Sequence, residues 1–410
     1  MHPIDFRGVF SLLEDPAVIK DKDVKDAVYN LIASCSTKYH YITQSAASIL
    51  HLLHKHEHLP VCLAEAVAHA DQKYHDSSLA VALLREIGRL NTKEYARDGL
   101  GADNIGKFLV ELAERLPKVV TTNVGILMPH FGGESYKIRS ALVSVFGKLI
   151  SKMSKELAGN GLSETNRLRS KQAMIDVLIE RSRDTTAYTR SRVLQTWAEL
   201  CEDHAVSIGL WNQVADVAAG RLEDKAAIVR KSALQLLSTL LKYNPFGPQL
   251  RTAAFEATLS KYKGQLESMS SQSQAEGPNK GDDEANENSD LRIGKENSEL
   301  NISEVAEEVV SEGLVGEDSG PSQNPEQVHQ PMQTSDVGGL EQTRALVASL
   351  EAGLRFTKCV ASTMPVLVQL LASSNGSDVE HTIQLLMCAR QFNVDGAEPC
   401  LRKMLPLVRE

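Results

Sequence analysis

The sequence has few aromatic residues and no long apolar run. Tyr, Phe and Trp together account for 5% of its 410 residues, although 42% of the residues are hydrophobic. Strands of β-sandwiches are enriched in aromatic residues, so an apolar fraction dominated by Leu, Ala and Val favours helix-on-helix packing. No stretch of about 18 apolar residues occurs, and the first residues form no apolar signal segment. We therefore expect neither a membrane span nor a secretory signal.

Signatures of catalysis and of cofactor binding are also scarce. The six cysteines are scattered without a CxxC pair, so we expect reduced thiols that are mostly buried on helical faces. Gly99, Gly101 and Gly106 do not have the spacing of a dinucleotide-binding loop, and we interpret them as a turn between helices. No P-loop, Ser-His-Asp set or pair of catalytic carboxylates is evident. The prediction is a protein that is not an enzyme, with no catalytic residue, cofactor or metal.

A cluster of histidines near the N-terminus is the one pattern that could suggest a metal. His54 and His58 are four residues apart and would share one face of a helix, as two zinc ligands can. No HExxH motif and no neighbouring cysteine supports this, so surface histidines are the favoured interpretation and a metalloenzyme is a minor alternative. The cluster comprises His40, His51, His54, His56, His58, His69 and His75.

Acidic residues are concentrated in one segment. The net charge of the whole chain is −9, but residues 264–339 contain seventeen acidic and three basic residues, so the remainder of the chain is mildly basic. The same segment has few large apolar residues. Such a composition cannot bury enough surface to offset the entropy of ordering, which predicts a disordered acidic insert over 264–339. The insert would separate a helical array over 1–263 from further helical repeats over 340–410.

Apolar residues recur at helical spacing in blocks of about 15–20 residues, and three of these blocks align with one another. The blocks are ESYKIRSALVSVFGKLI from Glu134, DTTAYTRSRVLQTWAEL from Asp184 and DKAAIVRKSALQLLSTLL from Asp224. Superposing their arginines also superposes the apolar positions that follow. The distances between blocks bracket the roughly 40–47 residues typical of HEAT and armadillo repeats. We therefore predict an all-α HEAT-repeat solenoid interrupted by the acidic insert.

Five residues define the register of these repeats. Asp184 and Asp224 each stand six residues before an arginine, Arg190 and Arg230 respectively. An aspartate at the turn before a helix can accept hydrogen bonds from free backbone N–H groups. The arginine could reach the aspartate of its own repeat or that of an adjacent repeat, and the spacing does not decide which. Trp197 occupies an apolar position of the register and is expected to lie in the core.

Several long stretches of the chain resemble the condensin subunit 1 family, the non-SMC HEAT subunits of condensin I. The resemblance covers most of the chain outside the insert, although the chains of that family are much longer. The family's N-terminal region and phosphorylated C-terminal tail have no counterpart in this sequence. The resembling stretches are REIGRLNTKEYARDGLGADNIGKFLVELAERLPK from Arg85, RSRVLQTWAELCE from Arg190, AAGRLEDKAAIVRKSALQLLSTLLKYNPFGPQL from Ala218 and DVEHTIQLLMCARQFNVDGAEPCLRKMLPLV from Asp378.

The resemblance implies a regulatory scaffold that acts in mitotic chromosome condensation. Its implied partners are the condensin kleisin subunit, the SMC ATPase subunits and double-stranded DNA bound without sequence specificity. The implied location is the nucleus and the chromosome, with the cytoplasm in interphase as an alternative. A different HEAT-repeat adaptor, such as a nuclear transport receptor or a phosphatase scaffold, remains the second functional hypothesis.

Basic residues in the repeat core are candidates for contacting DNA. A basic stripe along a solenoid can follow phosphates and provide affinity without reading sequence. The competing interpretation is a solvated helical face whose cations pair with nearby Glu and Asp residues. The candidate DNA-binding residues are Arg183, Arg192, Lys225 and Lys231.

Overall fold

The computed structural model describes residues 6–91, 99–155, 162–275 and 336–403, and all regular structure in these ranges is helical. The predicted all-α class is confirmed. The chain divides into two compact units. Unit 1 comprises Met1–Ala205 and Asp224–Leu236, and unit 2 comprises Val206–Glu223 and Leu237–Glu410.

Unit 1 is a stack of helix pairs. Its helices up to residue 132 are α1 (Phe6–Leu12), α2 (Pro16–Lys20), α3 (Lys22–Ala33), the π-helix η1 (Ser34–Lys38), α4 (Ile42–Lys55), α5 (Pro60–Tyr74), α6 (Ser78–Arg89), α8 (Gly99–Arg115), α9 (Pro117–Asn123) and the 3₁₀-helix η2 (Val124–Gly132). They are followed by α10 (Tyr136–Lys155), α11 (Leu162–Arg181) and α12 (Ala187–Glu202). Helix α14 (Ala227–Lys242) begins in unit 1 and ends in unit 2.

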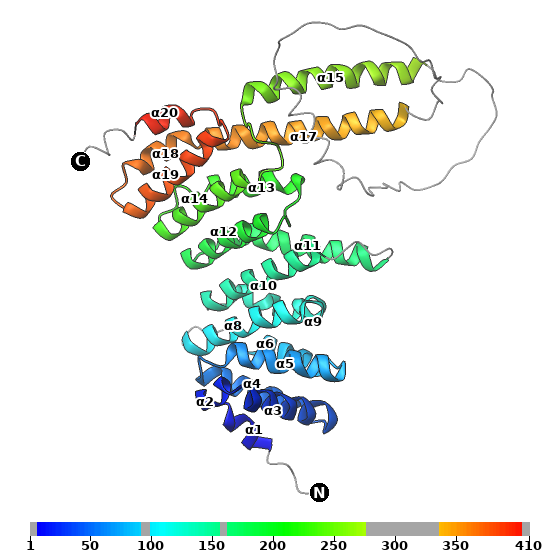
Figure 1. Ribbon diagram of the computed structural model, residues 1–410, viewed down its shortest axis with the longest axis vertical. Coiled ribbons are helices and arrows are strands. Elements are labelled where there is room, and N and C mark those ends of the chain that lie inside the picture. Colours follow the sequence, from blue (N-terminus) through cyan, green and yellow to red (C-terminus); the bar gives the residue numbers. More distant parts are fainter. Residues whose placement is uncertain (1–5, 92–98, 156–161, 276–335, 404–410) are drawn as a thin grey trace, which may run out of the picture. The chain divides into compact units, whose positions relative to one another are not determined.

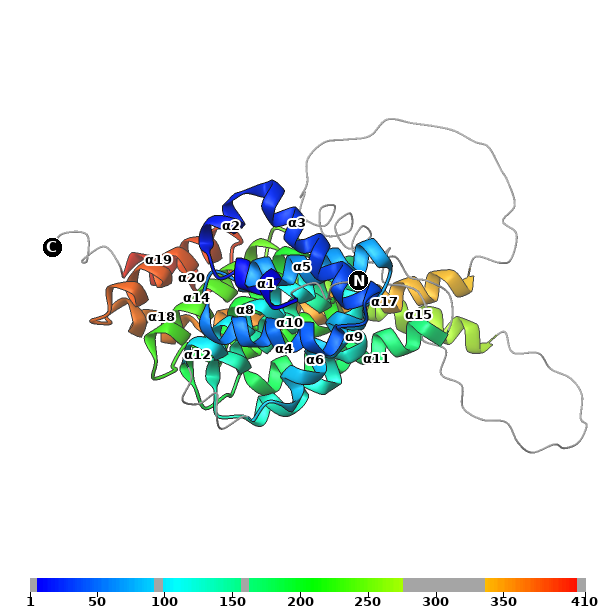
Figure 2. The ribbon, with the colours of Figure 1, turned by 90° about the horizontal axis from the view of Figure 1, so that it is seen from below.

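The helices of unit 1 form two layers. Helices α3, α5, α8, α10 and α12 pack against one another in that order, while α4 packs on α6, and α6 on η2. Figure 1 shows the pairs from α3 to α12 one above another, and Figure 2 looks along this stack. Each pair buries an apolar stripe against the next pair, which is the arrangement expected of HEAT repeats.

Small residues let the helices of the first layer approach closely. A Cβ atom on Gly106 of α8 would lie 2.8 Å from the Cβ of Ala141 in α10. A Cβ on Gly147 of α10 would collide with the side chain of Thr196 in α12. Gly99, Gly101 and Gly106 thus all lie within α8, so their interpretation as a turn between helices was wrong. Close helix packing explains at least Gly106 without any phosphate loop.

Local sequence signals explain several helix ends. Asp21 caps α3 by accepting hydrogen bonds from the N–H groups of Asp23 and Val24. Pro60 opens α5 at a position where its missing N–H costs nothing. His40 and His75 adopt left-handed backbone angles at the turns that follow η1 and α5.

Unit 2 has an aromatic core. Its helices are α13 (Ile208–Ala219), the end of α14, α15 (Thr252–Ala275), α17 (Asp336–Ser362), α18 (Met364–Leu371), α19 (Gly376–Gln391) and α20 (Ala397–Arg402). Phe356 of α17 is fully buried and contacts Trp211 edge-to-face, at a ring distance of 6.5 Å. Phe246 packs on the same Phe356 ring at 5.7 Å.

The structure moves both predicted boundaries of the acidic insert. Helix α15 continues to Ala275, and α17 begins at Asp336, so residues 264–275 and 336–339 are helical. The two helices pack on each other, and Lys263 forms an ion pair with Glu351 at 2.8 Å. The predicted insert began too early because residues 264–275 contain only two large apolar residues, Leu266 and Met269. In the structure both of these side chains are half-buried. The rest of the predicted insert, residues 276–335, lies outside the described residues.

Among the described residues, no helix is both long enough and apolar enough to cross a membrane.

Candidate functional site

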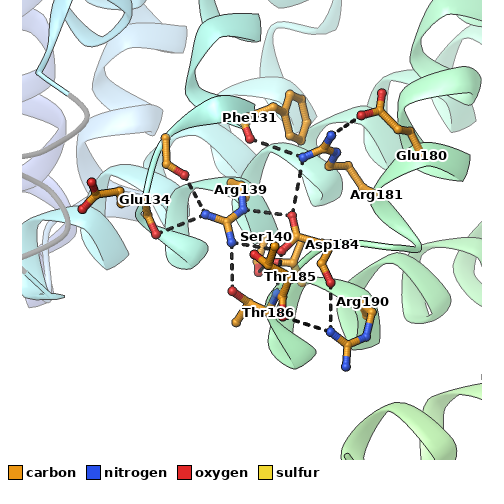
Figure 3. Close-up of polar contacts among 12 residues, drawn as sticks. Phe131, Glu134, Arg139, Ser140, Glu180, Arg181, Asp184, Thr185, Thr186 and Arg190 are labelled. Carbon is orange, nitrogen blue, oxygen red and sulfur yellow. Dashed lines mark hydrogen bonds and ion pairs between the residues drawn. The ribbon is translucent and has the colours of Figure 1, made fainter. Parts of the chain in front are cut away.

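An arginine of one repeat binds the aspartate of the next in the core of unit 1. Arg139 of α10 donates from Nε and Nη2 to the two carboxylate oxygens of Asp184, both at 2.9 Å. Its Nη2 also donates to the Thr186 hydroxyl, and its Nη1 donates to the carbonyl oxygens of Gly133 and Glu134. All five N–H donors of the guanidinium are therefore used (Figure 3).

The next repeat boundary has an equivalent pair. Arg190 of α12 donates from Nε and Nη2 to the carboxylate of Asp224, both at 2.8 Å. Its Nη1 donates to the carbonyl oxygens of Asp184 and Thr185, just as Arg139 does one repeat earlier. Arg230 makes the corresponding contact with the Asp224 carbonyl at 2.9 Å. We call the Arg139–Asp184 and Arg190–Asp224 pairs the ladder.

The ladder shows which aspartate each arginine binds, which the sequence spacing did not decide. Each arginine binds the carboxylate of the following repeat and the backbone of the turn before its own helix. Each aspartate in turn fixes the turn before its own helix, since Asp184 accepts from the Thr186 N–H and Asp224 from the Ala226 N–H. Bidentate charge-assisted pairs fix geometry as well as energy. The ladder therefore sets the register between neighbouring repeats.

Asp184 lies between two cations, which the register alone did not reveal. The guanidinium of Arg181 lies 3.6 Å from the Asp184 carboxylate and sits over the ring of Phe131. Burial alone would raise the pKa of Asp184, but the hydrogen bonds from Arg139 and Thr186 outweigh it and hold the pKa below its usual range. The sequence does carry a signal for Arg181, because Arg221 likewise stands three residues before Asp224.

The apolar register places one large side chain per repeat in the core. Phe146, Trp197 and Leu237 occupy equivalent positions, and each is at most 1% exposed. Trp197 is among the largest fully buried side chains in the described ranges. Its indole Nε1 is buried and has no hydrogen-bond partner there, so the side chain contributes by packing alone.

The four candidate DNA-binding residues do not form one stripe. Arg192 bonds the Ser144 hydroxyl at 2.7 Å and pairs with Glu199 at 2.9 Å, so its charge is already used. Arg183 and Lys225 are exposed in the turns before α12 and α14, and neither makes an ion pair with another described residue. Lys231 is half-buried one turn into α14. Only Arg183 and Lys225 therefore share a location, the turns in which the ladder aspartates lie.

The first repeats of unit 1 use a different polar network. The buried Tyr29 hydroxyl donates to Glu65 at 2.8 Å and lies 3.2 Å from the Cys62 sulfur. Glu65 also pairs with Lys25 at 3.5 Å and with Arg115 at 3.1 Å. Burial raises the pKa of Tyr29 well above its usual range. Burial would also raise the pKa of Glu65, but the Tyr29 hydrogen bond and the two cations lower it overall.

The histidine cluster is dispersed by the helix ends. Helix α4 ends at Lys55 and His56 has extended backbone angles, so the predicted shared helical face of His54 and His58 was wrong. His58 instead lies 3.3 Å from the Leu13 carbonyl, and His69 bonds the Asn30 side chain at 3.1 Å. In the described parts of the chain, no three His, Cys, Asp or Glu side chains are grouped so that they could hold a metal ion.

No protein-family model matches the chain. Over 402 residues, 98% of the chain, it is 54% identical to condensin-1 complex subunit CAP-D2 of Arabidopsis thaliana. It is 32% identical to condensin complex subunit 1 of Mus musculus over 265 residues, 64% of the chain. It is 23% identical to condensin complex subunit 1 of Saccharomyces cerevisiae over 407 residues, 98% of the chain.

The stacked helix pairs and their repeated ladder define an α-solenoid of HEAT-type repeats. The relatives then specify which solenoid it is: the chain belongs to the condensin subunit 1 family, as its sequence stretches indicated. The match covers 28% of the Arabidopsis protein, 19% of the mouse protein and 33% of the yeast protein. The chain thus spans a third or less of the length of these relatives.

Proposed function

We propose that the chain is a non-catalytic scaffold of a condensin complex that acts in mitotic chromosome condensation. It would bind an extended segment of the kleisin subunit and hold it near the SMC ATPase subunits, in the nucleus and on the chromosome. The ladder is the observation that carries this proposal. Buried bidentate pairs fix the repeats relative to one another, so the stack presents an extended surface that is already ordered. Binding a partner to such a surface then loses little conformational entropy.

Co-expression of the 410-residue chain with kleisin and SMC subunits tests this proposal. We expect the chain to co-elute with the kleisin on size exclusion, and to recruit SMC heads through it. A chain that stays apart from both but binds a small GTPase or a phosphatase catalytic subunit would overturn the condensin proposal. That outcome would favour a transport receptor or phosphatase scaffold.

Contact with duplex DNA is a second part of the proposed function, supported by Arg183 and Lys225. Both cations are exposed in the turns just before long helices, whose N-terminal backbone N–H groups also favour anions. Binding should be weak, independent of sequence and steeply dependent on salt. Glu223 is exposed in the same turn as Lys225, and Glu134 is exposed in the equivalent turn before α10, which limits the number of phosphates that this surface could hold.

Charge reversal tests the DNA contact. In Arg183→Glu with Lys225→Glu, the slope of log K against log salt should flatten by about 2, because two phosphate contacts of ~0.9 each are lost. The matched control is Lys20→Glu with Lys22→Glu, which changes the net charge equally at two other exposed lysines of unit 1. Equal losses in both variants would mean a general charge effect. Unchanged binding in a folded Arg183/Lys225 variant would remove DNA from the proposal.

A further inference from the structure

Large apolar side chains are exposed at the first turn of the first-layer helices α8, α10 and α12 and of α14, the next helix of the ladder repeats. The exposed fractions are 43% for Leu100 in α8, 37% for Tyr136 in α10, 57% for Tyr188 in α12 and 41% for Ile228 in α14. Tyr188 and Ile228 occupy the same register position, two residues before Arg190 and Arg230. We call these four side chains the apolar row. Scattered exposed apolar residues need no explanation, but a recurrence at one place in four repeats does.

Two members of the row are in direct contact across a repeat boundary. The rings of Tyr136 and Tyr188 stack at a centroid distance of 5.1 Å and an angle of 24°. At the preceding repeat boundary, the Lys137 ammonium donates to the carbonyl oxygen of Gly99 at 2.6 Å, which ties α10 to the residue before Leu100. The apolar surfaces at the start of α10 and α12 therefore adjoin each other.

The backbone beneath the row is fixed before any partner binds. Arg139 holds the carbonyl oxygens of Gly133 and Glu134, immediately before Tyr136. Arg190 holds those of Asp184 and Thr185, immediately before α12. Groups that are already ordered lose little conformational entropy on binding. The ladder thus preorganises the row as well as the stack.

The charges around the row favour an acidic occupant. The unpaired Arg183 and Lys225 and the Lys137 ammonium outnumber the exposed Glu134 and Glu223. The N-terminal ends of α8, α10, α12 and α14, each of 16 to 20 residues, add partial positive charge along the same turns. Both contributions have the same sign, so the surroundings of the row are positive.

We infer that the apolar row docks an extended, acidic peptide segment of a partner chain, with one large apolar side chain seated per repeat. Packed helices lie about 8–10 Å apart, and three residues of an extended chain span about 10 Å. An apolar residue at every third position with acidic residues between would therefore match both spacing and charge. A DNA backbone would gain nothing from Leu100 or Ile228, because it offers no apolar surface. This inference deepens the proposed function by assigning a surface to the extended segment.

The test replaces two exposed members of the row in the full chain. In Tyr188→Ser with Ile228→Ser, labelled 15-residue peptides that tile the kleisin and bind the parent should bind at least tenfold more weakly. The matched control is Leu31→Ser with Leu168→Ser, which removes exposed apolar side chains of 40% and 54% exposure from α3 and α11, away from the first turns of the first-layer helices. The control should bind like the parent. Unchanged peptide affinity in the row variant overturns the inference.

Three further outcomes separate the alternatives. A row variant that loses affinity for a 30-base-pair duplex but keeps the peptides would make the row a DNA surface. A parent chain that dimerises, and a row variant that does not, would make the occupant a second copy of the chain. If no kleisin peptide binds the parent, the proposed function fails. Selection from a random peptide library then tests whether the row docks acidic peptides at all. The docking inference would be supported by selected sequences that have spaced apolar residues among acidic ones and that bind the parent but not the row variant. Equal enrichment on the parent and on the row variant would overturn the inference.

Discussion

The N-terminal repeats, α3 to α8, and the ladder repeats, α10 to α14 as far as Leu236, bury similar apolar seams but join their helices through different polar groups. In the ladder repeats, an arginine and an aspartate recur at fixed sequence positions and meet across each boundary. In the N-terminal repeats, Tyr29, Glu65 and Arg115 come from three helices and occur once. The comparison separates what every repeat must do, which is to bury its stripe, from how the register between repeats is fixed.

The largest expected loss of stability comes from truncating the buried apolar side chains that both regions contain. Trp197→Ala should lower the free energy of unfolding by ~3–5 kcal/mol, because a fully buried aromatic side chain leaves a cavity. Phe108→Ala in α8, also fully buried, should cost a similar amount. Denaturant unfolding measures both. Trp197→Phe is the matched control and should cost much less, since it keeps most of the packing and removes an N–H without a partner.

The polar groups should separate the two regions. Asp184→Asn should destabilise by ~3 kcal/mol, because it leaves the buried Arg139 without its counter-charge. Tyr29→Phe should cost only about 1 kcal/mol, since Glu65 keeps both of its cations. The pair Arg139→Met with Asp184→Leu should recover part of the loss, because a buried ion pair can be replaced by packed apolar groups. Equal costs for Asp184→Asn and Tyr29→Phe would contradict the distinction.

The ladder could be predicted in part because it is local in the repeat. Asp184, Arg190, Asp224 and Arg230 recur at one spacing, so a single alignment within the chain finds them. The direction of each pair could not be found, because the distance between Arg190 and Asp224 depends on how two helix pairs stack. The role of Tyr29 was equally hidden, since nothing in the sequence links it to Glu65 or Arg115.

DNA contact by the four candidate residues stays a prediction, but the structure distinguishes among them. By sequence alone, Arg192 and Arg183 are equal candidates for contacting phosphates. In the structure Arg192 forms an ion pair with Glu199, and Arg183 forms none with another described residue. Solvent exposure and pairing are tertiary properties, so sequence composition cannot assign them. The exposed apolar row was missed because the sequence pattern places Tyr188 and Ile228 among the apolar residues of their helices, which are expected to be buried. Only the structure shows that these two side chains are exposed.

Acid should remove the contribution of the Asp184 carboxylate to stability. The pKa of Asp184 is lower in the folded chain than in the unfolded chain, so its contribution is fully present above the unfolded pKa, near 3.9, and is lost as pH falls through the folded pKa. The parent and Asp184→Asn should therefore differ most in stability near neutral pH and converge below about pH 4. Thermal unfolding at a series of pH values measures this. Glu65→Gln supplies the comparison from the N-terminal repeats, because the pKa of Glu65 is lowered too. Parallel curves for the parent and Asp184→Asn across the acid range would show that the Asp184 pKa is not lowered by folding.

The smallest effect would show whether the two regions open independently. Cys62 of α5 lies beside Tyr29 and is 4% exposed, while Cys201 of α12 is fully buried and burial raises its pKa to about 12. Both thiols should react with a thiol reagent at pH 8 only when their surroundings open, because the thiolate is the reactive form and neither sulfur is accessible. In Tyr29→Phe, a loss of ~1 kcal/mol confined to the N-terminal repeats should speed labelling of Cys62 about fivefold and leave Cys201 unchanged. Mass spectrometry of the labelled peptides resolves the two sites. If both thiols accelerate equally, the repeats of unit 1 open as one, and the ladder joins them into a single cooperative structure in spite of their different polar groups.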